Sequence, residues 1–325
     1  MAAELNPAAT PARPGGHPWA RLPAYVRLAK LGMVDYYLSL FVVGSLLLPQ
    51  ELPGDGLSTW ATLIAFLLGE VCLVGAAVAF DDVAGYRDGS DAANYGADAP
   101  VRKLARKPLL AGTLTEAAAV RFGWGALGTG GLCWTAALVA APHRPLWAVL
   151  GVVSAGIVTP QYSWGLRLGH RGLQEVFLAA VGWAFVLPLY GLLTGKATGL
   201  AAVEAFLFGL GPLLFGVYSN TNDIDGDRAV GRPTLACLLS KRGNTVFIGA
   251  LSALETAVIV AAALLGVAPW WFPLVMLPVT AARAGQFGTG MVRGNVLLGR
   301  LIGIRAHRIL VAALVAANLL IAHTD

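Results

Sequence analysis

Residues 220–227 read Asn220-Thr-Asn222-Asp223-Ile-Asp225-Gly-Asp227, and they close an apolar run that covers 200–221. An ionised carboxylate without a partner is costly beside a region of low dielectric constant. Two like unit charges about 4 Å apart repel by roughly 4 kcal/mol at an effective dielectric constant near 20. Acidic residues gathered at this position therefore require cations.

A second acidic cluster has the same setting. Asp81, Asp82, Asp88 and Asp91 follow the apolar run 59–80, so seven of the 18 Asp and Glu residues fall in two short clusters. Each cluster is predicted to open a long loop, at about 83–118 and 222–245. Mg2+ binds closely grouped oxygen atoms, and it usually retains several water ligands and also coordinates a substrate phosphate. The two clusters therefore predict a metal–phosphate site at a membrane face.

The composition predicts an all-α integral membrane protein. Hydrophobic residues make up 57% of the chain and charged residues 13%, whereas soluble domains are about 25% charged. Residues 1–20 contain no apolar run and are predicted to form a disordered tail. Residues 21–325 are predicted to form one domain of nine transmembrane helices around a central cavity. Runs long enough to cross a bilayer lie at 30–49, 59–80, 119–141, 145–163, 174–195, 200–221, 246–266, 268–282 and 303–322.

Basic residues are distributed unevenly between the two sides of this topology. All of the 23 Lys and Arg residues except Arg144 and Lys196 fall in the N-terminal segment and the even-numbered loops. This bias supports nine spans, and it predicts that the N-terminus and both acidic clusters are cytoplasmic. The topology also accounts for the net charge of +5 without a nucleic-acid partner.

Helical spacing orders the second cluster. If the helix continues to about 228, Asn220, Asp223 and Asp227 share one of its faces. Asp223 and Asp227 can then grip one metal ion while Asn220 supplies a neutral oxygen. Asp225 projects elsewhere, where it either pairs with Arg228 or is solvated.

This segment resembles the second aspartate-rich motif of the UbiA superfamily of intramembrane prenyltransferases. The resemblance implies that Asn220, Asp223 and Asp227 bind the Mg2+–diphosphate of a polyprenyl donor. It extends over most of the chain, about 20–322. Six positions of the motif are in register, namely Asn220, Asp223, Asp227, Gly231, Thr234 and Leu235.

The first cluster resembles the first motif of the superfamily, nearest to the branch that prenylates 1,4-dihydroxy-2-naphthoate, through Gly89-Ser90-Asp91. Aligned in this way, Gly85 stands where the superfamily has its main metal-binding Asp, and Asp81 replaces an Asn. Positions 81, 85 and 88 share a helix face. Asp81 together with Asp88 or Asp91 is therefore predicted to hold the first metal ion, and Asp82 also belongs to the predicted metal ligands.

Basic residues are predicted to neutralise the departing diphosphate, where charge accumulates in the transition state. The segment around Pro108 resembles the Arg-Pro-Leu-x-x-Gly run of the superfamily, with Lys107 in place of Arg. The positive-inside rule also places basic residues there, and Lys30 is open to a second reading as a lysine that snorkels to the interface. The predicted diphosphate contacts are Lys30, Lys103, Arg106, Lys107, Asn220 and Arg171.

The segment Tyr162 to Glu175 resembles the acceptor-side run of the naphthoate branch, although the Pro-Pro and Lys-Tyr pairs of that run are replaced. His170 is either a general base or an inert residue at the interface. Glu175 is predicted to face the cavity.

Two reactions follow from the resemblance, and both begin with ionisation of an allylic diphosphate. Either an aromatic acceptor attacks the cation, as in a prenyltransferase, or the cation closes on its own double bonds, as in a UbiA-type terpene cyclase. A transporter for an anionic lipid or metabolite would explain the apolar spans and the basic and acidic residues but not the six-position motif. Aromatic side chains can stabilise the cation, and the candidates are Trp124, Trp164, Trp183, Tyr190 and Tyr218. The predicted catalytic set is Asp81, Asp88, Asp223, Asp227 and Tyr218.

Overall fold

The structure is a computed structural model that describes residues 22–31, 35–48, 56–95 and 104–324. All regular structure within these ranges is helical, which confirms the prediction of an all-α fold. The predicted tail 1–20 lies outside the described residues. In chain order the helices are α1 (Leu22–Leu28), η2 (Asp35–Leu38), α2 (Ser39–Leu46), α3 (Gly56–Asp88), α4 (Ser90–Tyr95), η3 (Leu104–Arg106), α5 (Glu116–Ala140), α6 (Leu146–Val158), η4 (Thr159–Tyr162), η5 (Leu168–His170), α7 (Gln174–Thr194), α8 (Gly199–Asn222), α9 (Ile224–Ala229), α10 (Leu235–Leu238), α11 (Lys241–Leu264), α12 (Phe272–Val275), α13 (Leu277–Phe287), η6 (Gly288–Val292) and α14 (Val296–Thr324).

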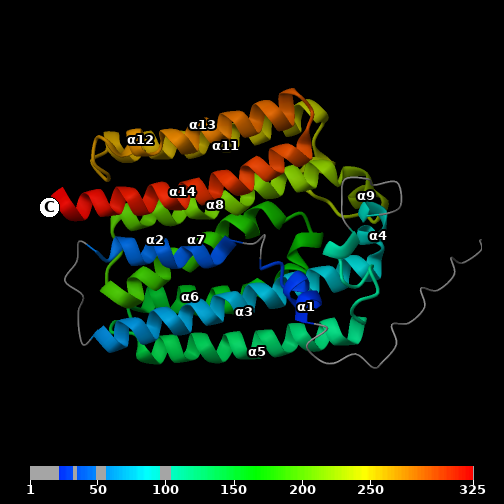
Figure 1. The fold of residues 1–325 in the computed structure, drawn as a ribbon, viewed down its shortest axis with the longest axis horizontal. Helices are drawn as coiled ribbons and strands as arrows, with labels where there is room; N and C mark the ends of the chain where they lie inside the picture. Colours follow the sequence, from blue (N-terminus) through cyan, green and yellow to red (C-terminus); the bar gives the residue numbers. More distant parts are fainter. Residues whose placement is uncertain (1–21, 32–34, 49–55, 96–103, 325) are drawn as a thin grey trace, which may run out of the picture.

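The long helices run side by side as a bundle (Figure 1). Among the described residues, five helices are long and apolar enough to cross a membrane, and they are α3, α7, α8, α11 and α14. The shorter apolar segments Asp35–Leu46 and Leu146–Tyr162 coincide with two further predicted spans. The predicted spans lie mostly in helices, while the number of nine crossings stays a prediction.

The helix ends at the two acidic clusters differ from expectation. The first cluster was expected to open a loop at about residue 83, but α3 continues to Asp88 and α4 begins at Ser90. Three of the four acids of the first cluster are therefore part of α3. A helix continuing to about 228 was also wrong in detail, because α8 ends at Asn222 and α9 begins at Ile224. The break is small, since the Asp227 amide still donates to the Asp223 carbonyl at 2.8 Å.

Side-chain hydroxyls begin several of the long helices. Thr115, Thr198 and Ser240 are the N-caps of α5, α8 and α11, and each accepts a hydrogen bond from the amide three residues ahead. Such a cap satisfies one of the backbone donors that the first helical turn leaves without a partner. The register of these helices is therefore encoded locally.

Small residues allow the helices to approach closely. A Cβ atom on Gly182 of α7 would lie 2.7 Å from the Cα atom of Gly209 on α8, and one on Gly130 of α5 would lie 3.0 Å from the Gly69 carbonyl oxygen on α3. Close backbone contact of this kind is how helices associate in a membrane, where lipid tails offer no hydrophobic driving force.

The bundle interior also contains paired polar side chains. Arg283 on α13 forms a two-pronged ion pair with Glu255 on α11, with N–O distances of 2.8 and 3.0 Å, and both residues are 1% exposed. Asn318 on α14 donates to Ser45 on α2 and to Glu204 on α8. These contacts join helices that are distant in sequence.

Candidate functional site

The two acidic clusters meet at one end of the bundle, where α4 and α9 lie side by side (Figure 1). Their contact is close, because a Cβ atom on Gly226 of α9 would overlap the Asn94 carboxamide of α4. The short helix after the first cluster therefore packs against the short helix after the second cluster.

Asp82 is the centre of the first cluster. Its side chain is fully buried, and its Oδ1 atom lies 2.8 Å from Lys107 Nζ and 3.0 Å from Lys30 Nζ. Lys107 Nζ also lies 2.7 Å from Asp91 Oδ1. Burial opposes the charge on Lys107, but Asp82 and Asp91 outweigh it and raise the pKa of this side chain, so the ammonium group stays charged.

Asp81 faces three different segments. Its Oδ1 atom accepts a hydrogen bond from Ser163 at 2.8 Å and lies 3.6 Å from Arg232 Nη2, while Oδ2 lies 3.5 Å from Lys30 Nζ. Lys30 reaches these carboxylates from a left-handed backbone conformation with φ of 50°, which is uncommon for a residue with a Cβ atom. The end of α1 is thus held in a strained geometry that directs a cation to α3.

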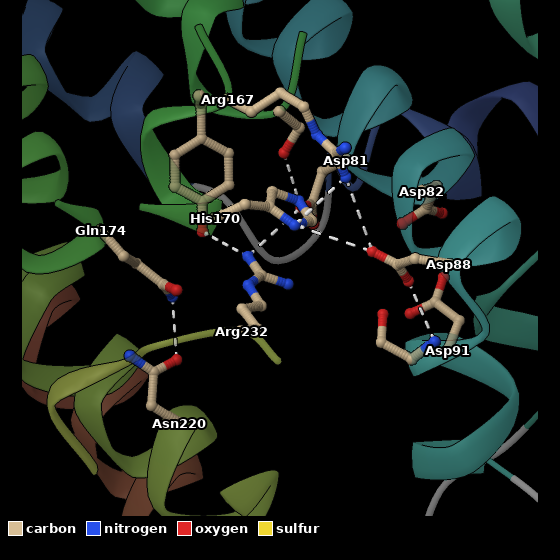
Figure 2. Close-up of polar contacts among 12 residues, drawn as sticks. Asp81, Asp82, Asp88, Asp91, Arg167, His170, Gln174, Asn220 and Arg232 are labelled. Atoms are coloured by element: carbon tan, nitrogen blue, oxygen red, sulfur yellow. Dashed lines mark hydrogen bonds and ion pairs between the residues drawn. The ribbon is translucent and has the colours of Figure 1, made fainter. Parts of the chain in front are cut away.

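Asp88 has a different environment (Figure 2). Its Oδ1 atom accepts from the Ser90 amide at 3.0 Å, which closes the turn between α3 and α4. Its Oδ2 atom lies 3.7 Å from His170 Nδ1 and 3.8 Å from Arg167 Nη2. Burial, Arg232 and Arg167 lower the pKa of His170, so its imidazole is neutral at pH 7.

The second cluster is oriented by the start of α7. Gln174 Nε2 donates to Asn220 Oδ1 at 2.8 Å (Figure 2). Asn220 Nδ2 donates to Glu175 Oε1 at 3.0 Å. Asn220 and Asp227 are buried and Asp223 is half-buried. Asn222 and Asp225, which point elsewhere on the helix, are exposed. The exposed position of Asp225 agrees with the solvated alternative, and Arg228 instead donates to the Cys237 carbonyl at 3.1 Å.

Arg232 connects the two clusters, and the sequence reasoning missed it. This residue follows the second cluster in the chain, yet its guanidinium group lies beside Asp81 and donates to the Tyr162 hydroxyl at 3.3 Å (Figure 2). Burial opposes its charge, but Tyr162, Asp81 and Asp227 together raise the pKa of Arg232. Its place directly after Gly231 in the motif was the signal that could have pointed to it.

The predicted diphosphate contacts separate into two groups. Lys30 and Lys107 lie among the carboxylates, whereas the side chains of Arg106 and Arg171 are exposed. Lys103 lies outside the described residues. Arg167 and His170, close to Arg171 in sequence, are the residues of that segment that approach the first cluster.

The aromatic candidates also lie in separate places. Tyr218 is fully buried, packs against Gly290 and Gly299, and its hydroxyl has no hydrogen-bond partner among the described residues. Trp124 and Trp164 pack around Phe80 instead, with ring centroids 5.4 and 4.8 Å from the Phe80 ring.

The donor set fits a hard divalent cation such as Mg2+, which prefers oxygen ligands. Asp82 Oδ2 is buried and has no hydrogen-bond partner among the described residues. Within those residues, no group of three or more His, Cys, Asp or Glu side chains is arranged to hold a metal ion by itself. Mg2+ usually takes one or two carboxylates together with substrate phosphates rather than an all-protein cage, so a substrate would complete such a site.

The fold and the site define a helical membrane protein with carboxylates and cations grouped at one end of the bundle. The chain belongs to the UbiA prenyltransferase family, whose family model matches residues 40–288. No curated protein matches the chain closely enough to count as a relative.

Solved structures share the fold. A UbiA homolog from Aeropyrum pernix K1 is 17% identical with a TM-score of 0.64, and the alignment covers 87% of this chain and 98% of that one. A structure described as digeranylgeranylglyceryl phosphate synthase is 14% identical with a TM-score of 0.60, covering 92% and 99%. A UbiA homolog from Archaeoglobus fulgidus bound to DMAPP and Mg2+ is 12% identical with a TM-score of 0.57, covering 89% and 99%.

Proposed function

We propose that this chain is a Mg2+-dependent enzyme of the membrane that ionises an allylic prenyl diphosphate and transfers the prenyl group to an aromatic acceptor. The observation that carries this proposal is the meeting of two acidic clusters with Lys30, Lys107 and Arg232 at one end of an apolar bundle. Membership of the prenyltransferase family supports it, as do the solved structures of the Archaeoglobus fulgidus UbiA homolog bound to DMAPP or GPP with Mg2+.

The cations of this site suit a departing diphosphate. Breaking the allylic C–O bond leaves both bonding electrons on a diphosphate oxygen, so negative charge grows there in the transition state. Fixed cations aimed at such charge act strongly in a site that excludes water. Three cations from separate segments converge on Asp81 and Asp82, namely Lys30, Lys107 and Arg232. Each of them can therefore exchange its contact with a carboxylate oxygen for a contact with a diphosphate oxygen.

The metal ion would be held by carboxylates of the two clusters, and we assign Asp81, Asp82, Asp223 and Asp227 to this role, with Asn220 as a neutral oxygen. When bound, Mg2+ supplies Lewis-acid neutralisation of the phosphate oxygens. Gln174 and Glu175 hold the Asn220 carboxamide in one orientation. In the transfer step, an aromatic carbon of the acceptor forms a bond to the prenyl carbon and the ring then loses a proton to solvent.

The same proposal places the N-terminus and the acidic end of the bundle on the cytoplasmic side, as the distribution of Lys and Arg predicts. The diphosphate would then meet the site from water while the prenyl chain lies among the apolar helices. Labelling of a cysteine introduced at exposed Asp225, in sealed cells and in inverted vesicles, tests this orientation.

The test of the reaction is a product analysis. Membranes containing the enzyme are incubated with Mg2+ and geranyl, farnesyl or geranylgeranyl diphosphate, with and without a phenol or a dihydroxynaphthoate, and extracted with hexane. Prenylated product that requires both the acceptor and Mg2+ supports the proposal. Cyclic hydrocarbon formed without an acceptor would replace transfer by terpene cyclisation, and no release of diphosphate from any donor would reject both reactions. An Asp227→Asn variant serves as the inactive control.

A further inference from the structure

Gly85 and Asp91 form an unusual contact within the first cluster. A Cβ atom on Gly85 would lie 2.8 Å from Asp91 Cγ and 2.9 and 3.0 Å from its two carboxylate oxygens. Real Cβ atoms do not approach other heavy atoms so closely, so the Asp91 carboxylate occupies the space that a side chain at position 85 would need. Glycine at this position lets the carboxylate reach the backbone of α3.

The turn at Gly89 creates this contact. On a continuous helix, residues six apart lie on different faces, and Asp91 would point away from Gly85. Instead Gly89 adopts a φ of 80°, which favours glycine, and α4 starts in a new direction at Ser90. Asp88 stabilises this turn by accepting from the Ser90 amide, and its other oxygen faces Arg167 and His170.

The contact brings Asp91 into the group around Asp82 (Figure 2). Lys107 Nζ lies between the two, 2.7 Å from Asp91 Oδ1 and 2.8 Å from Asp82 Oδ1. Asp91 is 9% exposed, Asp82 is fully buried, and Asp82 Oδ2 has no hydrogen-bond partner among the described residues. The Asp82 and Asp91 carboxylates therefore share the Lys107 ammonium group, and Asp82 Oδ2 beside them accepts no hydrogen bond within the described part of the chain.

We propose that Asp91, rather than Asp88, supplies the carboxylate that works with Asp82 in binding the metal–diphosphate group, and that it does so in the space that Gly85 leaves open on α3. This inference rests on the proposed function and adds Asp91 to the ligands of its first cluster. Lys107 acts as the counter-ion that keeps the two carboxylates together. Asp88 is then a positioning residue, because its contact with Ser90 sets the direction of α4.

A binding measurement separates these roles without a prenyl substrate. Mn2+ binds to the same kinds of oxygen ligands as Mg2+, and depletion of its free electron paramagnetic resonance signal reports binding to the purified protein in detergent with inorganic diphosphate. Asp91→Asn is expected to weaken Mn2+ binding by at least about tenfold, since even residues that only support metal ligands contribute 10- to 100-fold. Asp225→Asn, which removes an exposed acid of α9, is the matched control and is expected to bind Mn2+ as the unmodified protein does.

A second variant, which moves the carboxylate from position 91 to position 85, distinguishes loss of a metal ligand from misfolding. Gly85→Asp alone is expected to weaken Mn2+ binding because its side chain collides with the Asp91 carboxylate. The double variant Gly85→Asp/Asp91→Gly moves the carboxylate from α4 to α3 and is expected to restore binding. Unchanged Mn2+ binding in Asp91→Asn would overturn the inference, as would a double variant that elutes as a folded protein yet binds no better than Asp91→Asn.

Failure of the proposed function would look different. If the unmodified protein and the double variant bind Mn2+ with diphosphate while no prenyl diphosphate is consumed, the ligand assignment stands and the reaction is wrong. If prenyl transfer occurs but Asp91→Asn retains full Mn2+ affinity, the reaction stands and the ligand assignment is wrong.

Discussion

Arg232 Nη2 lies 3.6 Å from Asp81 Oδ1, although Asp81 belongs to the first acidic cluster and Arg232 follows the second cluster, far along the chain. The chain between them includes the helices α4 to α9. Because Arg232 also donates to Tyr162 and interacts with Asp227, one guanidinium group ties the two halves of the site together.

Replacing Arg232 with Gln is expected to lower kcat/KM for the prenyl diphosphate by about 10- to 1,000-fold, because a fixed donor to developing charge has this order of effect. Inorganic diphosphate should also compete less well. Arg228→Gln is the control, because Arg228 is exposed and donates to the Cys237 carbonyl. Steady-state kinetics of both variants test this prediction. If Arg232→Gln has the same kcat/KM as Arg228→Gln and the unmodified enzyme, Arg232 has no role in the site.

Removing the carboxylate of Glu175 is expected to weaken metal binding by the second cluster, although the aspartates of that cluster are unchanged. Glu175 accepts from Asn220 and from the Leu235 amide, so Glu175→Leu leaves both donors without their partner. The apparent affinity for Mg2+ should fall about 10- to 100-fold, as for other supporting residues of metal sites. Glu116→Gln removes an exposed partner of Arg87 and should leave that affinity unchanged; equal effects in the two variants would contradict the prediction.

The contact between α4 and α9 is expected to control the assembly of the site. Gly226→Ala places a methyl group where the Asn94 carboxamide lies, so turnover should fall as α4 moves away from α9. The double variant Gly226→Ala/Asn94→Ala should recover much of the loss, because neighbouring residues couple in such a cycle. Additive losses in the double variant would show that the two residues act independently.

The buried ion pair of Arg283 and Glu255 is expected to dominate the stability of the helices around α13. Glu255→Leu leaves the buried Arg283 charge without its partner, at a cost of about 3–5 kcal/mol in the free energy of unfolding. Arg283→Met/Glu255→Leu should regain most of this loss, since both charges are gone. Unfolding in detergent measures both variants, and a single variant as stable as the unmodified protein would disprove the prediction.

The hydroxyl of Tyr218 offers a test of its predicted catalytic role. A buried hydroxyl without a hydrogen-bond partner carries a desolvation cost, so Tyr218→Phe should not lower the free energy of unfolding. The aromatic ring is retained, so any contribution through its π face also remains. Loss of turnover in a stable Tyr218→Phe protein would show that the phenol oxygen itself takes part in the reaction.

Local patterns account for the parts that could be predicted from the sequence. Apolar runs of membrane length predicted the helices, because the bilayer thickness sets the length of a spanning helix. The spacing of Asn220, Asp223 and Asp227 predicted a shared helix face, and the burial pattern agrees with it apart from the small break at Asp223. Both rest on residues within a few helical turns of each other.

The choice between Asp88 and Asp91 shows where this reasoning stops. Helical spacing places Asp88 on the face of Asp81 and Gly85, and α3 does continue to Asp88, but the same spacing cannot place Asp91 beyond the helix end. The left-handed turn at Gly89 redirects the chain, so the carboxylate that fills the space beside Gly85 is that of Asp91. Spacing rules hold only while the helix continues.

The sequence by itself determined the helical class of this protein, its apolar segments and the placing of acid at the ends of two of them. Only the tertiary structure decided which groups meet there: Arg232 with Asp81, Gln174 with Asn220, and Lys107 with both Asp82 and Asp91. The physical reason is that helix formation depends on neighbours along the chain, whereas these contacts depend on how distant helices pack and on turns that change their direction.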